Sequence, residues 1–366
     1  MSALTQYQWF PTGALLVPRF LHRATLLPSG RVLFSGGMVL GYPTASMEIY
    51  DPITGRSIAT GNMTMPRASH TATLLPSGKV LLAGGQGGTA TAEIYDPATG
   101  LSTPTGTMND DRGFHTATLL PSGRVLLAAG EKVAVEGYLL SAEEYDPGTG
   151  VFTPVGNLTQ LPRLFLTNAP LLGNGKVLFA GGSSSDGSSP LATAELYDPS
   201  SKTFSATGSM HVARNFYSIT LMADGKVLAA GCIDGTDTAL ASAEVYDPTT
   251  ATWTLIGSMI AARGYHAAVL MAGASILITG GDAGAGGGNA TLATVESCDA
   301  GVFTSRQHML TPRYGHTLTL LNDGSVLAAG DASSQNMEIY RMPVPNPTVS
   351  DIPSCAGRAG FEQAGF

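Results

Sequence analysis

The chain has 366 residues, of which 43% are hydrophobic and only 13% are charged. This composition excludes an intrinsically disordered chain, because such chains combine few apolar residues with many charges. The formal net charge of −8 and the lack of any Lys/Arg run exclude a nucleic-acid surface, which needs clustered cations. No apolar stretch reaches the roughly 18 residues of a membrane helix, so membrane insertion is not expected.

The opening residues 1–5 contain neither a basic region nor a hydrophobic signal core. As written, the chain is expected in the cytoplasm, whereas a removed signal would fit secretion or the cell surface equally well. The cysteines Cys232, Cys298 and Cys355 give no disulfide framework and no metal-type spacing. We therefore expect no cofactor.

The first predicted element is a strand over about residues 7–15, which contains Trp9 and Phe10. Its sequence aligns with residues 203–210, which form the last strand of a repeated unit further along the chain. The segment thus resembles one strand of a repeat that is separated from the rest of its unit.

From about residue 19 a unit recurs seven times, at spacings of about 45–51 residues, which is typical of propeller and solenoid repeats. Each unit begins with an arginine and carries a glutamate near its middle. The arginines are Arg19, Arg67, Arg112, Arg163, Arg214, Arg263 and Arg313. The glutamates are Glu48, Glu93, Glu143, Glu195, Glu244, Glu296 and Glu338.

Each unit predicts four short strands, which we call a, b, c and d. In the second unit, residues 70–75 form strand a, a Pro-Ser-Gly turn follows, residues 79–85 form strand b and residues 92–95 form strand c. Strands a and b are nearly continuous runs of apolar or small residues, which suits sheets that are covered on both faces. No segment shows convincing helical periodicity.

The seventh unit lacks strand d, because a proline-rich segment follows Tyr340. The strand at residues 7–15 supplies this missing piece and removes an exposed sheet edge. The sequence therefore predicts an all-β, seven-bladed propeller with four antiparallel strands per blade, formed by residues 1–340 and closed by its N-terminal strand. Residues 341–366 are predicted to form an extended, disordered tail.

The repeat resembles the kelch family, which includes the central domain of galactose oxidase. Double glycines end strand b at residues 36–37, 84–85, 181–182 and 280–281, and Tyr-Asp-Pro and a strand-d aromatic residue follow at the family's spacing. The resemblance covers about residues 8–340 and implies a propeller fold. Kelch propellers include protein-binding modules, sugar-handling enzymes and a copper oxidase, so the resemblance leaves the function open. Some units depart from the pattern, at Ala129, Cys232, Asp331 and Cys298.

The arginines have two possible roles. A buried arginine is costly without a partner, and the repeat supplies one glutamate for each arginine, so we expect Arg–Glu pairs that fix the blade geometry. In related kelch modules some arginines at this position grip acidic peptides. The resemblance therefore keeps all seven as candidate binding residues.

Five histidines lie three residues after an arginine. They are His22, His70, His115, His266 and His316. A ring of histidines could bind a metal, but strand alternation would turn them away from the arginines and into the blade stack. Leu166 and Tyr217 interrupt the ring, so we expect structural histidines and no metal.

Six blades carry an aromatic residue between the arginine and the histidine position. These residues are Phe20, Phe114, Phe165, Phe216, Tyr265 and Tyr314. Four of them lie two residues past the arginine, and alternation would place them on its face. They either wedge between blades or form a stacking platform beside cationic groups, which would suit a sugar or an aromatic side chain.

The loops between strands b and c vary most in length, and they are longest in blades 3–6. Rigid folds carry binding groups on such loops, although solvated polar loops would look the same. The candidates on these loops are Glu131, Lys132, Tyr138, Asp186, Asp234, Asp237, Asp282 and Asn289. The pair Asp110 and Asp111, just before Arg112, is also expected to be exposed.

The sequence contains no nucleophile motif and no phosphate-binding loop. We therefore predict a monomeric, non-catalytic propeller that binds a protein, peptide or glycan on the face formed by the d–a and b–c loops. One alternative is a carbohydrate-active enzyme resembling galactose oxidase or a sialic acid isomerase. The oxidase family needs two tyrosines, two histidines and a crosslinked cysteine, and neither Cys232 nor Cys298 lies in a matching motif. A second alternative is a structural spacer within a larger surface protein.

Overall fold

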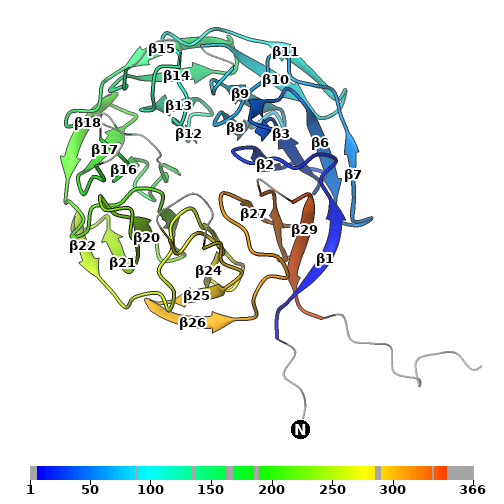
Figure 1. Ribbon diagram of the computed structural model, residues 1–366. Coiled ribbons are helices and arrows are strands. Elements are labelled where there is room, and N and C mark those ends of the chain that lie inside the picture. Colours follow the sequence, from blue (N-terminus) through cyan, green and yellow to red (C-terminus); the bar gives the residue numbers. More distant parts are fainter. Residues whose placement is uncertain are drawn as a thin grey trace, which may run out of the picture.

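A computed structural model describes residues 6–87, 90–133, 137–161, 163, 168–184, 189–284, 290–331 and 334–343. The described residues form strands and turns only, and none of them lies in a helix that could cross a membrane. Seven antiparallel sheets stand radially around one axis, with the chain running from blue to red around the ring in Figure 1. The predicted all-β, seven-bladed propeller is confirmed.

Each blade runs from an innermost strand a to an outermost strand d. Blade 1 contains β2 (Arg23–Leu26), β3 (Val32–Ser35), β6 (Met47–Asp51) and β7 (Arg56–Ala59), with a small hairpin of β4 (Met38–Val39) and β5 (Tyr42–Pro43). Blade 2 contains β8 (Thr71–Leu74), β9 (Val80–Ala83), β10 (Ala92–Asp96) and β11 (Leu101–Pro104). Blade 3 contains β12 (Thr116–Leu119), β13 (Val125–Ala128), β14 (Ala142–Asp146) and β15 (Val151–Val155).

The second half of the ring repeats this order. Blade 4 contains β16 (Val177–Ala180), β17 (Ala194–Asp198) and β18 (Thr203–Thr207), and its innermost segment joins β16 through the Leu171–Val177 bridge. Blade 5 contains β19 (Ser218–Leu221), β20 (Val227–Ile233), β21 (Ala239–Asp247) and β22 (Thr252–Leu255). Blade 6 contains β23 (Ala267–Leu270), β24 (Ile276–Thr279), β25 (Val295–Asp299) and β26 (Val302–Arg306). Blade 7 contains β27 (Thr317–Leu320), β28 (Val326–Ala329), β29 (Asn336–Arg341) and β1 (Gln8–Ala14).

The N-terminal strand closes the ring as predicted. Strand β1 pairs antiparallel with β29, and Trp9 lies opposite Tyr340 with a ring-centroid distance of 5.0 Å. Trp9 is buried, and its backbone N–H donates to Gln307 Oε1 of the preceding blade. The first and last parts of the propeller thus share one sheet (Figure 1). Of the predicted tail, residues 341–366, Arg341 still belongs to β29, and residues 344–366 lie outside the described residues.

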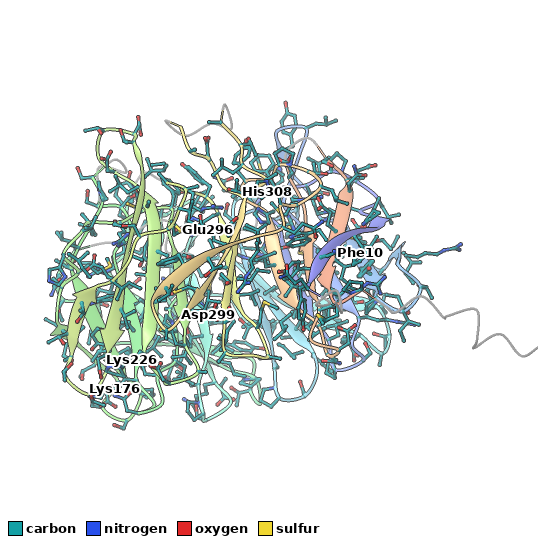
Figure 2. All side chains as sticks on the ribbon, turned by 90° about the horizontal axis from the view of Figure 1, so that it is seen from below. Phe10, Lys176, Lys226, Glu296, Asp299 and His308 are labelled. Atoms are coloured by element: carbon teal, nitrogen blue, oxygen red, sulfur yellow. The ribbon has the colours of Figure 1, made fainter. Side chains whose placement is uncertain are left out.

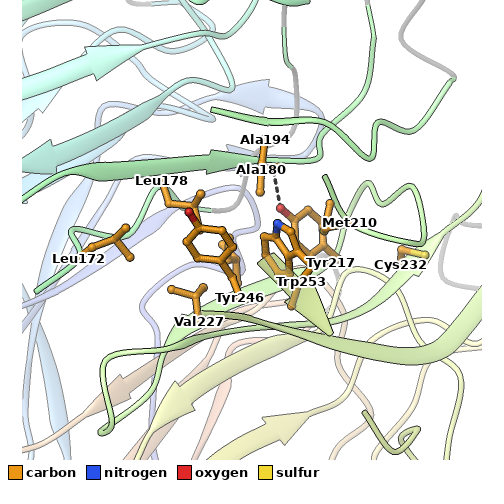
Figure 3. Close-up of a cluster of buried hydrophobic side chains, with 12 residues drawn as sticks. Leu172, Leu178, Ala180, Ala194, Met210, Tyr217, Val227, Cys232, Tyr246 and Trp253 are labelled. Carbon is orange, nitrogen blue, oxygen red and sulfur yellow. Dashed lines mark hydrogen bonds between the residues drawn. The ribbon is translucent and has the colours of Figure 1, made fainter. Parts of the chain in front are cut away.

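The hydrophobic core is divided among the interfaces between adjacent blades. At the interface of blades 4 and 5, Tyr246 and Trp253 pack against Leu178 and Ala180 of the neighbouring sheet (Figure 3). The first four residues of every strand b are buried, because neighbouring blades cover both faces of the sheet. This double coverage explains the continuous apolar runs in the sequence.

Candidate functional site

The seven repeat arginines are buried and paired. Each is at most 1% exposed, and each contacts the glutamate of its own repeat at 2.7–3.2 Å. In blade 3, Arg112 Nη1 donates to the carbonyls of Ala129 and Ser141, and Nη2 donates to Glu143 Oε1 at 3.0 Å. The predicted Arg–Glu pairs are therefore present in all seven blades.

The second oxygen of each glutamate holds the loop that enters the blade. Glu143 Oε2 accepts from the backbone N–H of Asn109 at 2.9 Å, and Glu338 Oε2 accepts likewise from Leu310. Each pair thus fastens a d–a loop to its sheet. The guanidinium groups are enclosed by these contacts, so they do not present the surface cations that the resemblance to peptide-binding modules implied.

The five histidines join adjacent blades. Their Nε2 atoms are bonded to hydroxyl groups of a neighbouring blade at 2.7–3.2 Å, as in the contact between His115 and Thr71 Oγ1 at 3.1 Å. Burial, reinforced by nearby arginines, lowers the pKa of His22 to about 3. In blade 5, Tyr217 replaces the histidine and donates to the carbonyl of Ala180 (Figure 3). These residues lie inside the blade stack, as the sequence suggested.

The segment between each arginine and histidine is not a strand. The residue two positions past the arginine has a positive φ in every described blade: Leu21 (54°), Ser69 (54°), Phe114 (50°), Phe216 (48°), Tyr265 (53°) and Gly315 (61°). The inner strands begin only after the histidine position. Strand alternation therefore does not apply here, and the aromatic side chains do not share the face of the buried arginines.

In the described blades these positive-φ residues form two series of backbone hydrogen bonds, across blades 1–3 and blades 5–7, which we together call the backbone ring. The N–H of Tyr265 donates to the carbonyl of Phe216 at 2.8 Å, and that of Gly315 donates to the carbonyl of Tyr265 at 2.8 Å. Ser69 and Leu21 are joined in the same way at 3.0 Å. Left-handed backbone is unusual for aromatic residues. The hydrogen bonds between blades hold the backbone in this conformation and thereby set the direction of the aromatic side chains.

Three of the aromatic residues form a continuous row, which we call the aromatic row: Phe216, Tyr265 and Tyr314. The first two rings stack with centroids 4.1 Å apart, and the Tyr265 and Tyr314 rings meet edge to face at 6.5 Å. All three side chains are partly exposed. Phe20 and Phe114 are also partly exposed but lie in other blades, and Phe165 is outside the described residues.

Carboxylates lie next to this row. Burial, together with the negative charges of Asp237 and Asp282, raises the pKa of Tyr265 to about 12. Asp237 is exposed at the tip of the hairpin joining β20 to β21, whereas Asp282 is buried and its backbone forms bridges with Gly264 and Thr291. The charges that act on Tyr265 are therefore those of carboxylates.

The acidic candidates of blade 3 support their own loop. Asp111 Oδ2 accepts from the N–H of Val133 at 2.7 Å. Glu131 is half-buried, which raises its pKa, and its backbone bridges to Gly113 and Tyr138. Both residues lie on the same loop face as the row, but no contact joins them to it within the described residues. The candidates Asp186 and Asn289 lie outside the part of the chain that is described.

The walls of the loop face include one feature that the sequence reasoning missed. Figure 2 shows this face on the side of His308, opposite Lys176 and Lys226. On it, the β4–β5 hairpin of blade 1 exposes Leu40 (92%) and Tyr42 (77%). The only available signal was the Leu40–Gly41 turn between two β-prone residues.

The fold defines this protein as a seven-bladed β-propeller. A comparison with known families matches the Kelch motif over residues 222–260, so this segment, which lies mainly in blade 5, carries a kelch repeat. No curated protein matches it. Among solved structures it is similar to a "novel fungal alcohol oxidase with catalytic diversity among the AA5 family, in complex with copper". The two share 18% identity over 92% of this chain and 76% of that chain, with a TM-score of 0.73, which shows a shared fold.

Among the described residues we find no cluster of ligands that would fit a copper centre built from imidazole and sulfur. Copper in proteins is bound by imidazole and sulfur ligands that converge on one point. Within the described residues no three His, Cys, Asp or Glu side chains converge. The repeat histidines are spread around the ring with Nε2 bonded, and burial raises the pKa of Cys232 to about 11.

Proposed function

We propose that this protein is a carbohydrate-binding propeller, and that the aromatic row of Phe216, Tyr265 and Tyr314 binds the sugar. The observation that carries the proposal is this partly exposed row with carboxylates beside it. A pyranose has one face of C–H groups, which suits the electron-rich face of an aromatic ring. Its hydroxyl groups would donate to carboxylates such as Asp237.

The burial of the arginines supports one ligand class over another. An acidic peptide would need surface cations, and the seven guanidinium groups are enclosed and bonded within the blades. An aromatic surface flanked by carboxylates favours a neutral, hydroxyl-rich ligand instead. The asymmetric rim, with projecting hairpins in blades 1 and 5, would then restrict which glycans reach the row.

The repeat supplies a clean test. Tyr265→Gly removes the ring at a position where blade 7 has Gly315, and glycine accepts the positive φ without strain. Leu21→Gly is the matched control, because it makes the same backbone change in the same ring without removing an aromatic group. After a glycan array has identified ligands for the wild type, we expect Tyr265→Gly to weaken binding by roughly fivefold or more, measured by calorimetry.

Equal loss of affinity in both glycine variants would contradict the proposal, since it would assign the effect to the backbone ring. An array on which the wild-type protein binds no glycan would also contradict it.

The fold similarity to a fungal alcohol oxidase makes alcohol oxidation a second candidate, which the lack of a fitting copper cluster among the described residues disfavours. The test is oxygen consumption by the copper-loaded protein with a panel of primary alcohols. Turnover that depends on copper and disappears in Tyr265→Gly would favour this candidate over simple binding.

A further inference from the structure

The inner strands of the propeller are reached by solvent, although blades cover both of their faces. Strands β2, β8, β19, β23 and β27 all contain partly exposed residues, whereas every residue of the adjacent strands b is buried at the same depth in the sheet. Their only uncovered side is the edge that faces the propeller axis, so the solvent lies there. We call this space the channel.

One cation lies on the channel wall. Arg23 is the first residue of β2, two positions past the positive-φ residue Leu21, and it is partly exposed. Its Nε donates to the carbonyl of His70 in blade 2 at 2.6 Å. This bond directs the guanidinium along the wall towards blade 2, where burial and then the charge of Arg23 lower the pKa of His70.

The charge of Arg23 has no counter-ion among the described residues. Among the described residues no carboxylate lies within 4 Å of it. In Arg19 and Arg67, by contrast, burial lowers the pKa and the paired Glu48 or Glu93 raises it again. Burial alone lowers the pKa of Arg23. Its two Nη groups make no hydrogen bond in the described part of the chain, which leaves a free planar fork of donors.

The fold does not need an arginine at this position. In other blades the equivalent residue is a hydroxyl that bonds the neighbouring histidine, as in Thr71–His115, Thr317–His22 and Ser218–His266. In blade 1 this bond is made instead by Ser35, which lies directly opposite Arg23 across the strand pair and contacts His70 at 2.9 Å.

Blade 6 makes the same exchange, and the freed position there is an alanine. Thr279 lies opposite Ala267 and bonds His316 at 2.7 Å. A small residue is therefore sufficient at this position when the opposite strand supplies the hydroxyl that bonds the histidine. An arginine there adds an enclosed charge, which is unfavourable without a partner.

We propose that the channel contains an anion-binding site in which the Nη groups of Arg23 bind a small oxyanion, either a phosphate or a carboxylate. A guanidinium binds both groups through two parallel hydrogen bonds. The free edges of the inner strands add unpaired backbone N–H groups along the same wall. This site is separate from the aromatic row and does not depend on the proposed carbohydrate binding.

The test compares Arg23→Thr with the wild type, using inorganic phosphate and acetate as probes at a constant ionic strength set with sodium chloride. Threonine is the residue that blades 2, 3 and 7 have at this position, so the variant is expected to fold. Arg31→Thr is the control, because it removes the same charge from a 51% exposed side chain. Calorimetry should show saturable binding that weakens about tenfold or more in Arg23→Thr and is unchanged in Arg31→Thr.

The tighter of the two probes identifies the oxyanion as phosphate or carboxylate. Wild-type protein that binds neither probe, or Arg23→Thr protein that binds them as tightly as the wild type, would overturn the proposal. Anion binding should survive in Tyr265→Gly, which keeps this result distinct from the test of carbohydrate binding.

Discussion

At the scale of single residues, the arginine–glutamate pairs combine a large cost of dehydration with nearly complete hydrogen bonding. Arg112 is buried with its charge opposed by Glu143 and with two backbone carbonyls as further acceptors. Removing one partner of such a pair leaves the other charged, buried and unpaired, which is far more damaging than losing a surface contact.

We expect Arg112→Met to lower the free energy of unfolding by about 3–5 kcal/mol, measured by urea denaturation. The surface pair of Arg31 and Asp51 provides the control, and Arg31→Met should cost less than about 1 kcal/mol. A stability loss of similar size in both variants would show that the buried pair has no special structural role.

The arginine–glutamate pairs could be predicted from the sequence, whereas the orientation of the aromatic residues could not. The spacing of arginine and glutamate predicted their pairing, because a buried charge in a repeat requires a counter-charge in the same repeat. The direction of Tyr265 could not be predicted in this way. Its positive φ depends on a backbone hydrogen bond to Phe216 of the adjacent blade, and no local pattern encodes a contact between blades.

At the scale of elements, the end of strand b is shaped by the blade that follows it. Gly84 has a φ of +63°, and a Cβ there would lie 2.4 Å from the carbonyl oxygen of Arg112 and 2.8 Å from His115 Cε1. Ala129 occupies the same position in blade 3 with the same φ. Its N–H bond to Ser141 is 3.3 Å long.

The neighbouring blade explains why alanine replaces glycine at residue 129. The blade after Ala129 has Leu158 where the blade after Gly84 has Met108, whose Cε would lie 3.1 Å from an added Cβ. Alanine thus occurs where a shorter residue replaces the facing methionine and where the sequence has Leu166 in place of the facing histidine. The sequence shows the alanine at residue 129, but the shorter side chain that makes room for it belongs to the next repeat.

We expect Gly84→Ala to lower the free energy of unfolding by about 1–3 kcal/mol through overpacking. Adding Met108→Leu, which copies one of the two side-chain changes in the unit after Ala129, should recover part of that loss. Denaturation of the single and double variants measures both effects, and a double variant that is less stable than Gly84→Ala would contradict this account of the interface.

At the scale of the whole molecule, the buried histidines make stability depend on pH around the entire ring. The folded pKa of His22 and of His316 is about 3, and burial also places the pKa values of His70, His115 and His266 well below their ordinary range. Unfolded histidine has a pKa near 6.5. The unfolded chain therefore takes up more protons than the folded chain below that pH, and stability falls as the pH falls from about 6.5 towards 3.

The variant His115→Tyr isolates one of these protons, because blade 5 already has Tyr217 at this position. Lowering the pH from 7.5 to 5.5 should destabilise the variant by about 1 kcal/mol less than the wild type. Urea denaturation at the two pH values checks this. Identical losses in both proteins would mean that His115 is not the neutral, buried group described here.

The overall architecture was predictable because a seven-fold repeat with one missing strand allows few arrangements. The closure by β1 followed from the same count and from the alignment of residues 7–15 with a later strand d. The Leu40–Tyr42 hairpin and the free guanidinium of Arg23 were not predictable, since each breaks the repeat instead of following it, and only the three-dimensional arrangement shows what surrounds them.

The pairing of β1 with β29 has a consequence for how the protein is made. Trp9 leaves the ribosome more than three hundred residues before Tyr340, its partner in the finished sheet. At ordinary translation rates of 5–20 residues per second, this delay is on the order of 20–60 s. Throughout that time the first strand has no sheet to join. The nascent chain therefore exposes an unpaired, partly apolar strand that chaperones would have to protect until the last repeat is synthesised.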